Sequence, residues 1–194
     1  MTAPAILMLD NVDSFTFMLV DYLRHLGADV TVVRSDSVSV PDALSTGRDG
    51  IVISPGPGGP KDAGISVELA RACVERRHPL LGICLGHQAL AVACGSSVSR
   101  SGPVHGKIAT VSHDATGLFG GLESPMHATR YHSLAVPDPR PPLIANAWTS
   151  DGVVMGMRHA HAPAHGVQFH PESVASDHGH ALLGAFLRIA STNA

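Results

Sequence analysis

The stretch that most constrains the fold of this chain runs from Leu80 to Gln88 and reads LLGICLGHQ. It predicts a buried strand that ends at Cys84 and turns at once into a helix. Gly82 and Gly86 flank the cysteine two residues away on each side, as in the G-x-nucleophile-x-G elbow, with a thiol in place of a hydroxyl. A turn this sharp leaves no room for side chains beside the nucleophile, so both flanking positions need glycine.

The same elbow has an electrostatic consequence for the cysteine. Its sulfur would lie at a helix N-terminus, where the helix dipole favours thiolate over thiol. The alternative is a buried core cysteine between two unrelated glycines. Because a strand pattern precedes the motif and a helix pattern follows it, the sequence favours Cys84 as a nucleophile.

Apolar runs alternate with helical patterns through the first half of the chain. Strands are expected at residues 6–9, 30–33, 51–54 and 79–83, with helices near 15–26, 65–77 and 85–92. Strands that are apolar on both faces and alternate with helices are typical of a parallel sheet that is covered on both sides. We therefore expect an α/β fold with a mostly parallel, open, twisted sheet and helices on both faces.

Ligands of such sheets bind beyond the carboxyl ends of the strands. Three loops are expected there: residues 10–13, residues 55–59 and the turn at Cys84. The sequence thus predicts that these loops share one rim and form one site.

The pattern changes from about residue 98 onward. Short strands at 108–111, 143–147, 153–157 and 166–169 are separated by turn residues, which favours a small antiparallel addition to the sheet. Residues 159–165 fit a hairpin turn, and a final helix carries apolar residues between 182 and 190. Because no linker, repeat or low-complexity segment divides the chain, we expect one domain over residues 1–194.

Composition argues against several classes of function. The 194 residues carry a net charge of −3 and no block of Lys or Arg, which argues against nucleic acid as a partner. No apolar run reaches the length of a membrane span, and the first residues lack a basic signal segment, so we expect no membrane contact and a cytoplasmic protein. The three cysteines and thirteen scattered histidines show neither disulfide nor metal-ligand spacing, so no metal site is expected.

A cysteine nucleophile needs a base and a group that orients the base. The segment GVQFHPE at residues 166–172 supplies both, because a short apolar strand would deliver His170 at its end and place Glu172 beside the imidazole. The alternative for His170 is a surface histidine next to a turn proline. His87 is a rival base because it adjoins the elbow, but its place on the first helical turn favours a packing role.

An oxyanion needs backbone N–H donors. The loop from Pro55 to Gly58 is suited to present them, since prolines fix the backbone and glycines allow close approach to a ligand. The amides of Gly56 and Gly58, with that of Leu85 after the nucleophile, are the candidates. For this loop taken by itself, a plain Pro-Gly turn after a strand is the better interpretation.

Five motifs in one chain carry a family resemblance that spans nearly the whole sequence. They resemble the class I (triad) glutamine amidotransferases, and among these the small, glutaminase subunits of anthranilate synthase and aminodeoxychorismate synthase. The motifs are DNVDSFT at residues 10–16, SPGPG at 54–58, GICLGHQ at 82–88, RYHSL at 130–134 and QFHPES at 168–173.

The resemblance implies a reaction and a role for each motif. Cys84 would attack the side-chain amide of L-glutamine, and His170, held by Glu172, would protonate the departing ammonia. Water would then release glutamate from a γ-glutamyl thioester. The implied glutamine and oxyanion site is formed by residues of four motifs: Gly56, Pro57, Gly58, Leu85, Gln88, Ser133 and Leu134.

The resemblance also implies a partner. Ammonia would pass to a larger chorismate-binding synthase subunit in a heterodimer or heterotetramer. Mg²⁺ is expected only in that subunit, and no cofactor is expected in this chain. The product would be anthranilate, for tryptophan biosynthesis, or aminodeoxychorismate, for folate biosynthesis, and one small subunit can serve both synthases.

Some features leave other functions open. The family pattern NYDSFTYNL is altered at Val12, Phe17 and Met18, which removes polar groups near the rim but leaves the three catalytic candidates in place. A γ-glutamyl hydrolase or the amidotransferase of another pathway would not need the RYHSL motif. A non-enzymatic interaction module that kept the fold would not need the cysteine, histidine and glutamate.

Overall fold

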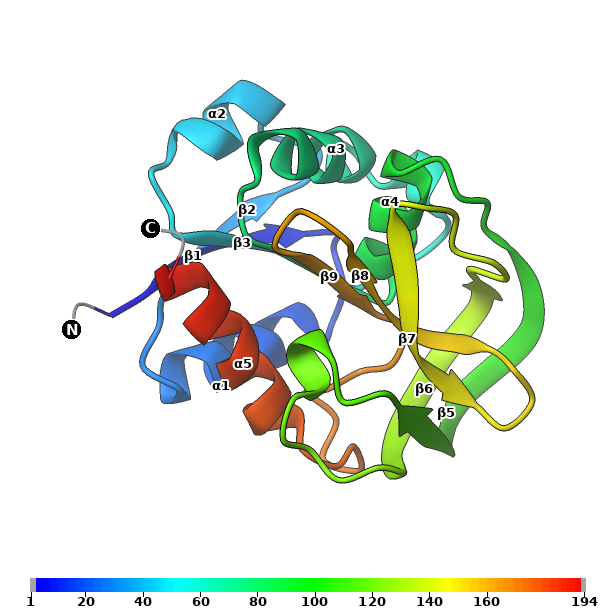
Figure 1. The fold of residues 1–194 in the computed structure, drawn as a ribbon. Coiled ribbons are helices and arrows are strands. Elements are labelled where there is room, and N and C mark those ends of the chain that lie inside the picture. The colour runs from blue at the N-terminus through cyan, green and yellow to red at the C-terminus, as the bar shows by residue number, and fades with distance from the viewer. Residues whose placement is uncertain (1–2, 193–194) are drawn as a thin grey trace.

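The computed structural model describes residues 3–192, except for the side chains of residues 103–105. Within this range, nine strands form one continuous sheet in the order β2-β1-β3-β4-β9-β8-β7-β5-β6, with helices on both of its faces (Figure 1). The expected fold class is confirmed. The antiparallel addition, however, extends the same sheet.

Five parallel strands make up one side of the sheet. They are β1 (Ala5–Asp10), β2 (Asp29–Arg34), β3 (Gly50–Ile53), β4 (Leu80–Ile83) and β9 (Ala164–Val167). Side chains alternate across this layer, because successive residues of a strand point to opposite faces. In β1, Ile6 and Met8 join one buried apolar cluster, and Leu7 and Leu9 join the other.

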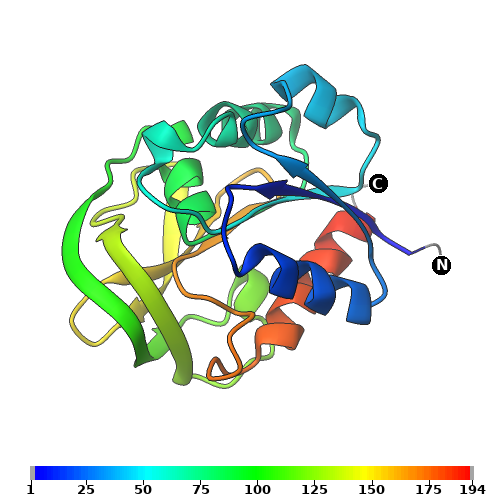
Figure 2. The same cartoon turned by 180° about the vertical axis from the view of Figure 1, so that it is seen from behind.

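Helices cover each of these clusters. One face carries α1 (Thr16–His25) and α5 (Gly179–Thr192), and the opposite face carries α2 (Val40–Ser45), α3 (Ser66–Arg76) and α4 (Leu85–Ala93) (Figures 1 and 2). Short 3-10 helices, η1 (Pro60–Asp62) and η2 (Gly117–Phe119), lie in the connections. These positions agree with the helices expected from the sequence.

The antiparallel strands are β5 (Ser99–His113), β6 (Met126–Ala135), β7 (Leu143–Thr149) and β8 (Val154–His159). The sequence did not predict β6, and it predicted only the last part of β5. Glycines, a proline and two register shifts interrupt the pairing of β5, while charged and polar residues alternate along β6, so neither shows a continuous apolar pattern.

One expected pairing is wrong. Residues 166–169 were expected in the antiparallel addition, but β9 pairs in parallel with β4, with Gly82 opposite Gly166 and Ile83 opposite Val167. Only its other edge is antiparallel, against β8. The hairpin between β8 and β9 thus returns the chain to the strand that leads into the cysteine elbow.

The carboxyl ends of β1, β3, β4 and β9 meet at one edge of the sheet, so the expected shared rim is confirmed. Asn11, after β1, joins the loop after β3: its backbone N–H donates to Oγ of Ser54 over 2.9 Å, and its Nδ2 donates to the Ser54 carbonyl over 3.2 Å. Oγ of Ser66 donates to Oδ1 of Asn11 over 2.9 Å. These bonds hold two of the site loops together.

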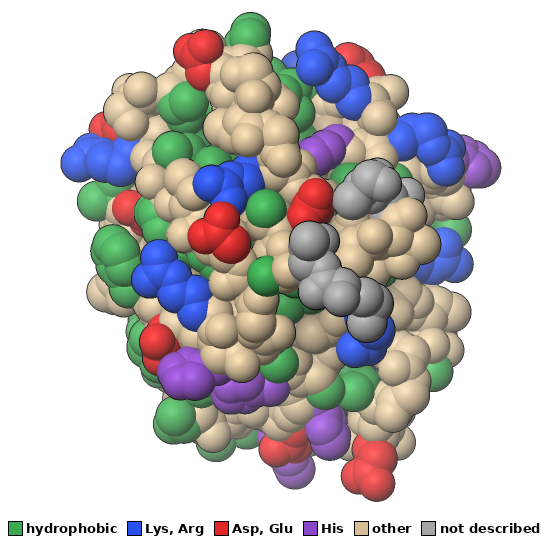
Figure 3. Space-filling view, turned by 90° about the vertical axis from the view of Figure 1, so that its left-hand side faces the viewer, with side chains coloured by type: hydrophobic (Ala, Val, Ile, Leu, Met, Phe, Trp, Pro, Cys, Tyr) green, Lys and Arg blue, Asp and Glu red, His purple; other side chains and the backbone are tan. Residues whose placement is uncertain are grey.

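Basic and acidic side chains are interspersed on the side of the molecule seen in Figure 3, and histidines gather toward one end of that view. Along residues 3–192, no helix combines the length and the apolar character needed to cross a membrane.

Candidate active site

The cysteine elbow has the geometry that its glycines predict. Cys84 lies between β4 and α4 with φ 50° and ψ −98°, a strained conformation for a residue with a side chain. A Cβ on Gly82 would come 2.3 Å from the carbonyl oxygen of Gly86, and one on Gly86 would come 2.3 Å from that of Ile53. Both positions therefore exclude any larger residue, which is what the sequence pattern indicated.

The elbow is held from the neighbouring strand as well. The backbone N–H of Cys84 donates to the carbonyl of Val167 in β9 over 2.8 Å, and its own carbonyl accepts from the backbone N–H of Gln88 over 3.1 Å. The cysteine therefore stands at the N-terminus of α4, where the helix dipole favours negative charge.

His170 and Glu172 form a buried pair. Nδ1 of His170 lies 2.6 Å from Oε1 of Glu172, and the two side chains are 3% and 0% exposed. Burial opposes protonation of the imidazole, but the interactions with Cys84 and Glu172 outweigh it and raise the pKa of His170 to about 10. Nε2 makes no hydrogen bond among the described residues, so the attraction between His170 and Cys84 is one of charge at a distance.

Two aromatic rings fix the orientation of the imidazole. The ring of Phe15 lies 5.2 Å from that of His170 at 65°, and the ring of Tyr131 lies 5.3 Å away at 81°. These edge-to-face contacts leave the histidine little rotational freedom. Neither residue was predicted to contact His170, although both fall within quoted motifs.

A cavity of about 150 Å³ opens beside the nucleophile. This volume suits a ligand of amino-acid size and is below the usual range for larger ligands. The cavity is lined by the nucleophile, by all seven residues predicted to bind substrate and by two neighbours: Gly56, Pro57, Gly58, Cys84, Leu85, Gln88, Tyr131, His132, Ser133 and Leu134. His170 and Glu172 are not part of this wall.

The 55–59 loop packs directly against the elbow. A Cβ on Gly56 would come 2.6 Å from the side chains of both Asn11 and Leu85, and Gly58 has φ +74°. These two glycines let the backbone approach the first residue of α4 closely. The loop thus stands where an oxyanion site made with the Leu85 amide requires it.

The amide of Gln88 is fixed by two acceptors. Its Nε2 donates to the carbonyl of Leu134 over 3.0 Å and to Oε1 of Gln168 over 3.1 Å. Because both N–H bonds are used within the protein, the group that Gln88 can offer to a ligand is its carbonyl oxygen. An acceptor at this place suits an α-ammonium group.

The RYHSL motif organises the opposite wall of the cavity. Nε of Arg130 donates to Nε2 of His132 over 3.0 Å, and Nδ1 of His132 donates to the carbonyl of Leu134 over 2.9 Å. Burial and the adjacent Arg130 charge lower the pKa of His132 to about 4, so the ring is neutral at pH 7. The Leu134 carbonyl therefore accepts from both sides and is held in place.

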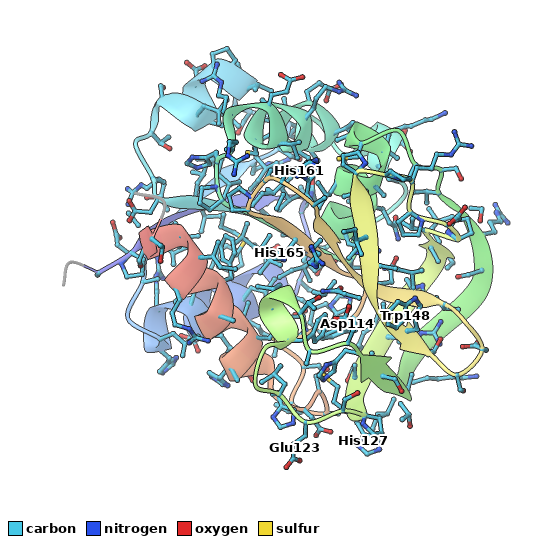
Figure 4. All side chains as sticks on the ribbon, in the orientation of Figure 1. Asp114, Glu123, His127, Trp148, His161 and His165 are labelled. Carbon is cyan, nitrogen blue, oxygen red and sulfur yellow. The ribbon has the colours of Figure 1, made fainter. Side chains whose placement is uncertain are left out.

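Other histidines serve the interior. His87 is fully buried, does not line the cavity and has its pKa lowered to about 4 by burial, in agreement with the packing role favoured from the sequence. His165 lies in the interior near β9, whereas Glu123 and His127 project to solvent at the end of the antiparallel part (Figure 4). Among the side chains that the structure describes, no group of three or more His, Cys, Asp or Glu could hold a metal ion.

Comparison with known proteins identifies relatives over almost the full length. Anthranilate synthase component 2 of Thermus thermophilus is 48% identical over 187 residues, which cover 94% of this chain and 91% of that protein. Aminodeoxychorismate synthase component 2 of Escherichia coli is 48% identical over 185 residues, which cover 94% and 98%. The crystal structure of a candidate GMP synthase protein from Thermoplasma acidophilum matches with a TM-score of 0.88 at 26% identity, covering 98% of this chain and 95% of that one.

The family profile of glutamine amidotransferase class-I matches residues 7–190. With this match and relatives of almost half identical sequence, the chain belongs to the class I glutamine amidotransferase family.

Proposed function

We propose that this chain is the glutaminase subunit of a chorismate-aminating synthase, of the anthranilate synthase component 2 type. The observation that carries the proposal is the cavity beside Cys84, because every residue predicted to bind glutamine lines it. Relatives named component 2 of anthranilate synthase and of aminodeoxychorismate synthase support the same function and a partner component.

The first half-reaction forms a thioester. The thiolate sulfur of Cys84 attacks the side-chain amide carbon of glutamine, and the negative charge that develops on oxygen is stabilised by the amides of Gly58 and Leu85. His170, protonated because its pKa is raised to about 10, gives its Nε2 proton to the leaving nitrogen, and ammonia departs. Glu172 keeps the ring oriented through Nδ1.

The second half-reaction restores the enzyme. Neutral His170 takes a proton from water, the hydroxide attacks the thioester carbon, and the carbon–sulfur bond breaks to release glutamate and the Cys84 thiolate. Gln88 and the Ser133–Leu134 backbone hold the α-amino and carboxylate ends throughout. Each step uses groups of this chain, so we propose that it needs no cofactor of its own and that Mg²⁺ belongs to the synthase subunit.

The proposed setting is the cytoplasm, because a nucleophilic thiol must stay reduced. Assembly with the synthase subunit, as a heterodimer or heterotetramer, would receive the ammonia before it equilibrates with solvent. The synthase partner also decides the product, and the 48% identity to relatives of both kinds keeps aminodeoxychorismate, or service to both synthases, as the alternative.

The test uses the reconstituted complex with each of the two large subunits. The variant Cys84→Ser should lose product formation from glutamine and keep it from free ammonia, and Cys94→Ser should keep both, because Cys94 does not line the cavity. Whichever large subunit yields product from glutamine identifies the pathway. Loss of ammonia-dependent turnover in Cys84→Ser would contradict the division of labour.

The other candidates make different predictions. A γ-glutamyl hydrolase would release glutamate from longer γ-glutamyl substrates without any large subunit. An interaction module would form no thioester with a glutamine analogue, even in the complex. Either result would overturn the proposal.

A further inference from the structure

The parallel pairing of β9 with β4 places one more polar residue at the nucleophile. Ile83 stands opposite Val167, so the next residues along the two strands, Cys84 and Gln168, leave the sheet side by side. Gln168 is fully buried, between Val167 and Phe169, which are also fully buried. A buried amide is costly unless its polar atoms are paired, so its partners reveal what it is for.

Both ends of the Gln168 side chain are paired with residues of the candidate site. Its Nε2 lies 3.6 Å from Sγ of Cys84 and donates to it, and its Oε1 accepts from Nε2 of Gln88 over 3.1 Å. The Gln88 amide in turn donates to the carbonyl of Leu134 on the far wall of the cavity. One line of hydrogen bonds thus joins the sulfur to the residues proposed to hold the substrate.

We infer that Gln168 is a positioning residue that holds the Cys84 sulfur and the Gln88 amide in register with each other. The inference rests on the proposed function and deepens it, since it says how the nucleophile is coupled to recognition of the glutamine α-amino end. An N–H donor aimed at sulfur stabilises negative charge there and selects one side-chain rotamer of the cysteine. The same amide, through its oxygen, fixes which way the Gln88 carbonyl faces.

Another buried amide shows what a purely structural role looks like. Asn146 in β7 is 1% exposed, and its Nδ2 donates over 3.2 Å to the backbone carbonyl of Thr116, which is not part of the site. Gln168 instead donates and accepts only between side chains of the site in its observed bonds. Asn146 therefore provides a matched control for burial of an amide without contact to the nucleophile.

The experiment measures alkylation of Cys84 by iodoacetamide at pH 7, followed by mass spectrometry, in the full chain and in four variants. Gln168→Met should slow alkylation about tenfold, the effect of losing one hydrogen bond to a charged acceptor. Gln88→Met should slow it about threefold, although Gln88 does not bond to the sulfur, because the Gln168 amide then loses its anchor. Asn146→Leu should stay within about twofold of the native rate.

The double variant Gln88→Met/Gln168→Met distinguishes coupling from two separate effects. If the two amides act as one unit, it should be about tenfold slow, like Gln168→Met alone, whereas independent effects would multiply to about thirtyfold. A native alkylation rate in Gln168→Met, a multiplicative double variant, or an equal loss in Asn146→Leu would each overturn the inference. Gln88→Met tests the same link should Gln168→Met fail to fold, as judged by circular dichroism.

Glutamine hydrolysis in the complex gives an independent measurement. Gln168→Met should lower kcat and raise KM together, because both the sulfur and the Gln88 carbonyl lose their positions. Alkylation needs neither glutamine nor a partner, so it tests the inference even if the native complex hydrolyses no glutamine. That second outcome would count against the proposed function alone.

Discussion

Replacing Glu172 with glutamine tests how a buried carboxylate prepares the imidazole for proton transfer. Glu172→Gln keeps the length of the side chain and an oxygen that accepts from Nδ1 of His170, so it removes mainly the charge. The native pair is 2.6 Å apart with both side chains buried. Since a hydrogen bond to a charged group contributes about 1.5–3 kcal/mol, the substitution should lower the pKa of His170 by about 1–2 pH units.

The assay for this change is NMR titration of labelled histidine, with His170 identified through its own substitution. The midpoint should fall from about 10 in the native chain, and kcat for glutamine hydrolysis should fall about a hundredfold, because a less basic and less oriented ring transfers protons poorly. KM should change little, since Glu172 does not line the cavity. An unmoved midpoint, or a loss confined to KM, would refute the reasoning.

The same pair makes a prediction about stability. A folded-state pKa of about 10, above the ordinary 6.5, means that protonated His170 stabilises the fold. That contribution is complete below pH 6.5 and is lost as the pH rises through the folded pKa. Urea unfolding should therefore show a fall in the native free energy of unfolding between pH 7 and pH 10, and Glu172→Gln should reduce this fall.

Three further predictions concern the framework of the site. A Cβ on Gly86 would come 2.3 Å from a backbone oxygen, so Gly86→Ala should lower the free energy of unfolding by about 2–3 kcal/mol; Gly184→Ala in α5, where the nearest atom is 3.6 Å away on a flexible arginine, should raise it by about 0.5–1 kcal/mol, and equal urea midpoints would contradict this contrast. Val12 has φ 60° and is 57% exposed, so Val12→Asn should stabilise the chain by about 0.5–1 kcal/mol, seen as a higher Tm. Burial lowers the pKa of His165 to about 4, so its contribution is complete above pH 6.5 and is lost as the pH falls toward 4; His165→Gln should reduce the loss of unfolding free energy between pH 6.5 and pH 5 by up to about 2 kcal/mol, measured by urea unfolding.

Local sequence patterns predicted the parts of this site that are set by local sterics. The glycines around Cys84 are required by backbone contacts within six residues or with the adjacent strand, so a five-residue pattern carries the information. Strands β1 to β4 were found for a similar reason, because burial on both faces leaves continuous apolar runs. Strand β6 leaves no such run, and the Ser133–Leu134 wall was identified only through its motif.

The rest of the site depends on pairing between distant segments, which no local pattern encodes. The turn between residues 159 and 165 correctly indicated a hairpin, and that signal suggested an antiparallel strand at 166–169. The other edge of β9 pairs with β4, about eighty residues earlier in the chain, and this register alone brings the sulfur of Cys84 beside Gln168. The wrong pairing thus hid Gln168, because an antiparallel addition remote from β4 gives this amide no reason to contact the nucleophile. Once β9 is placed beside β4, the elbow and the segment carrying His170 become neighbouring strand ends, and a buried amide between them has the cysteine sulfur within reach.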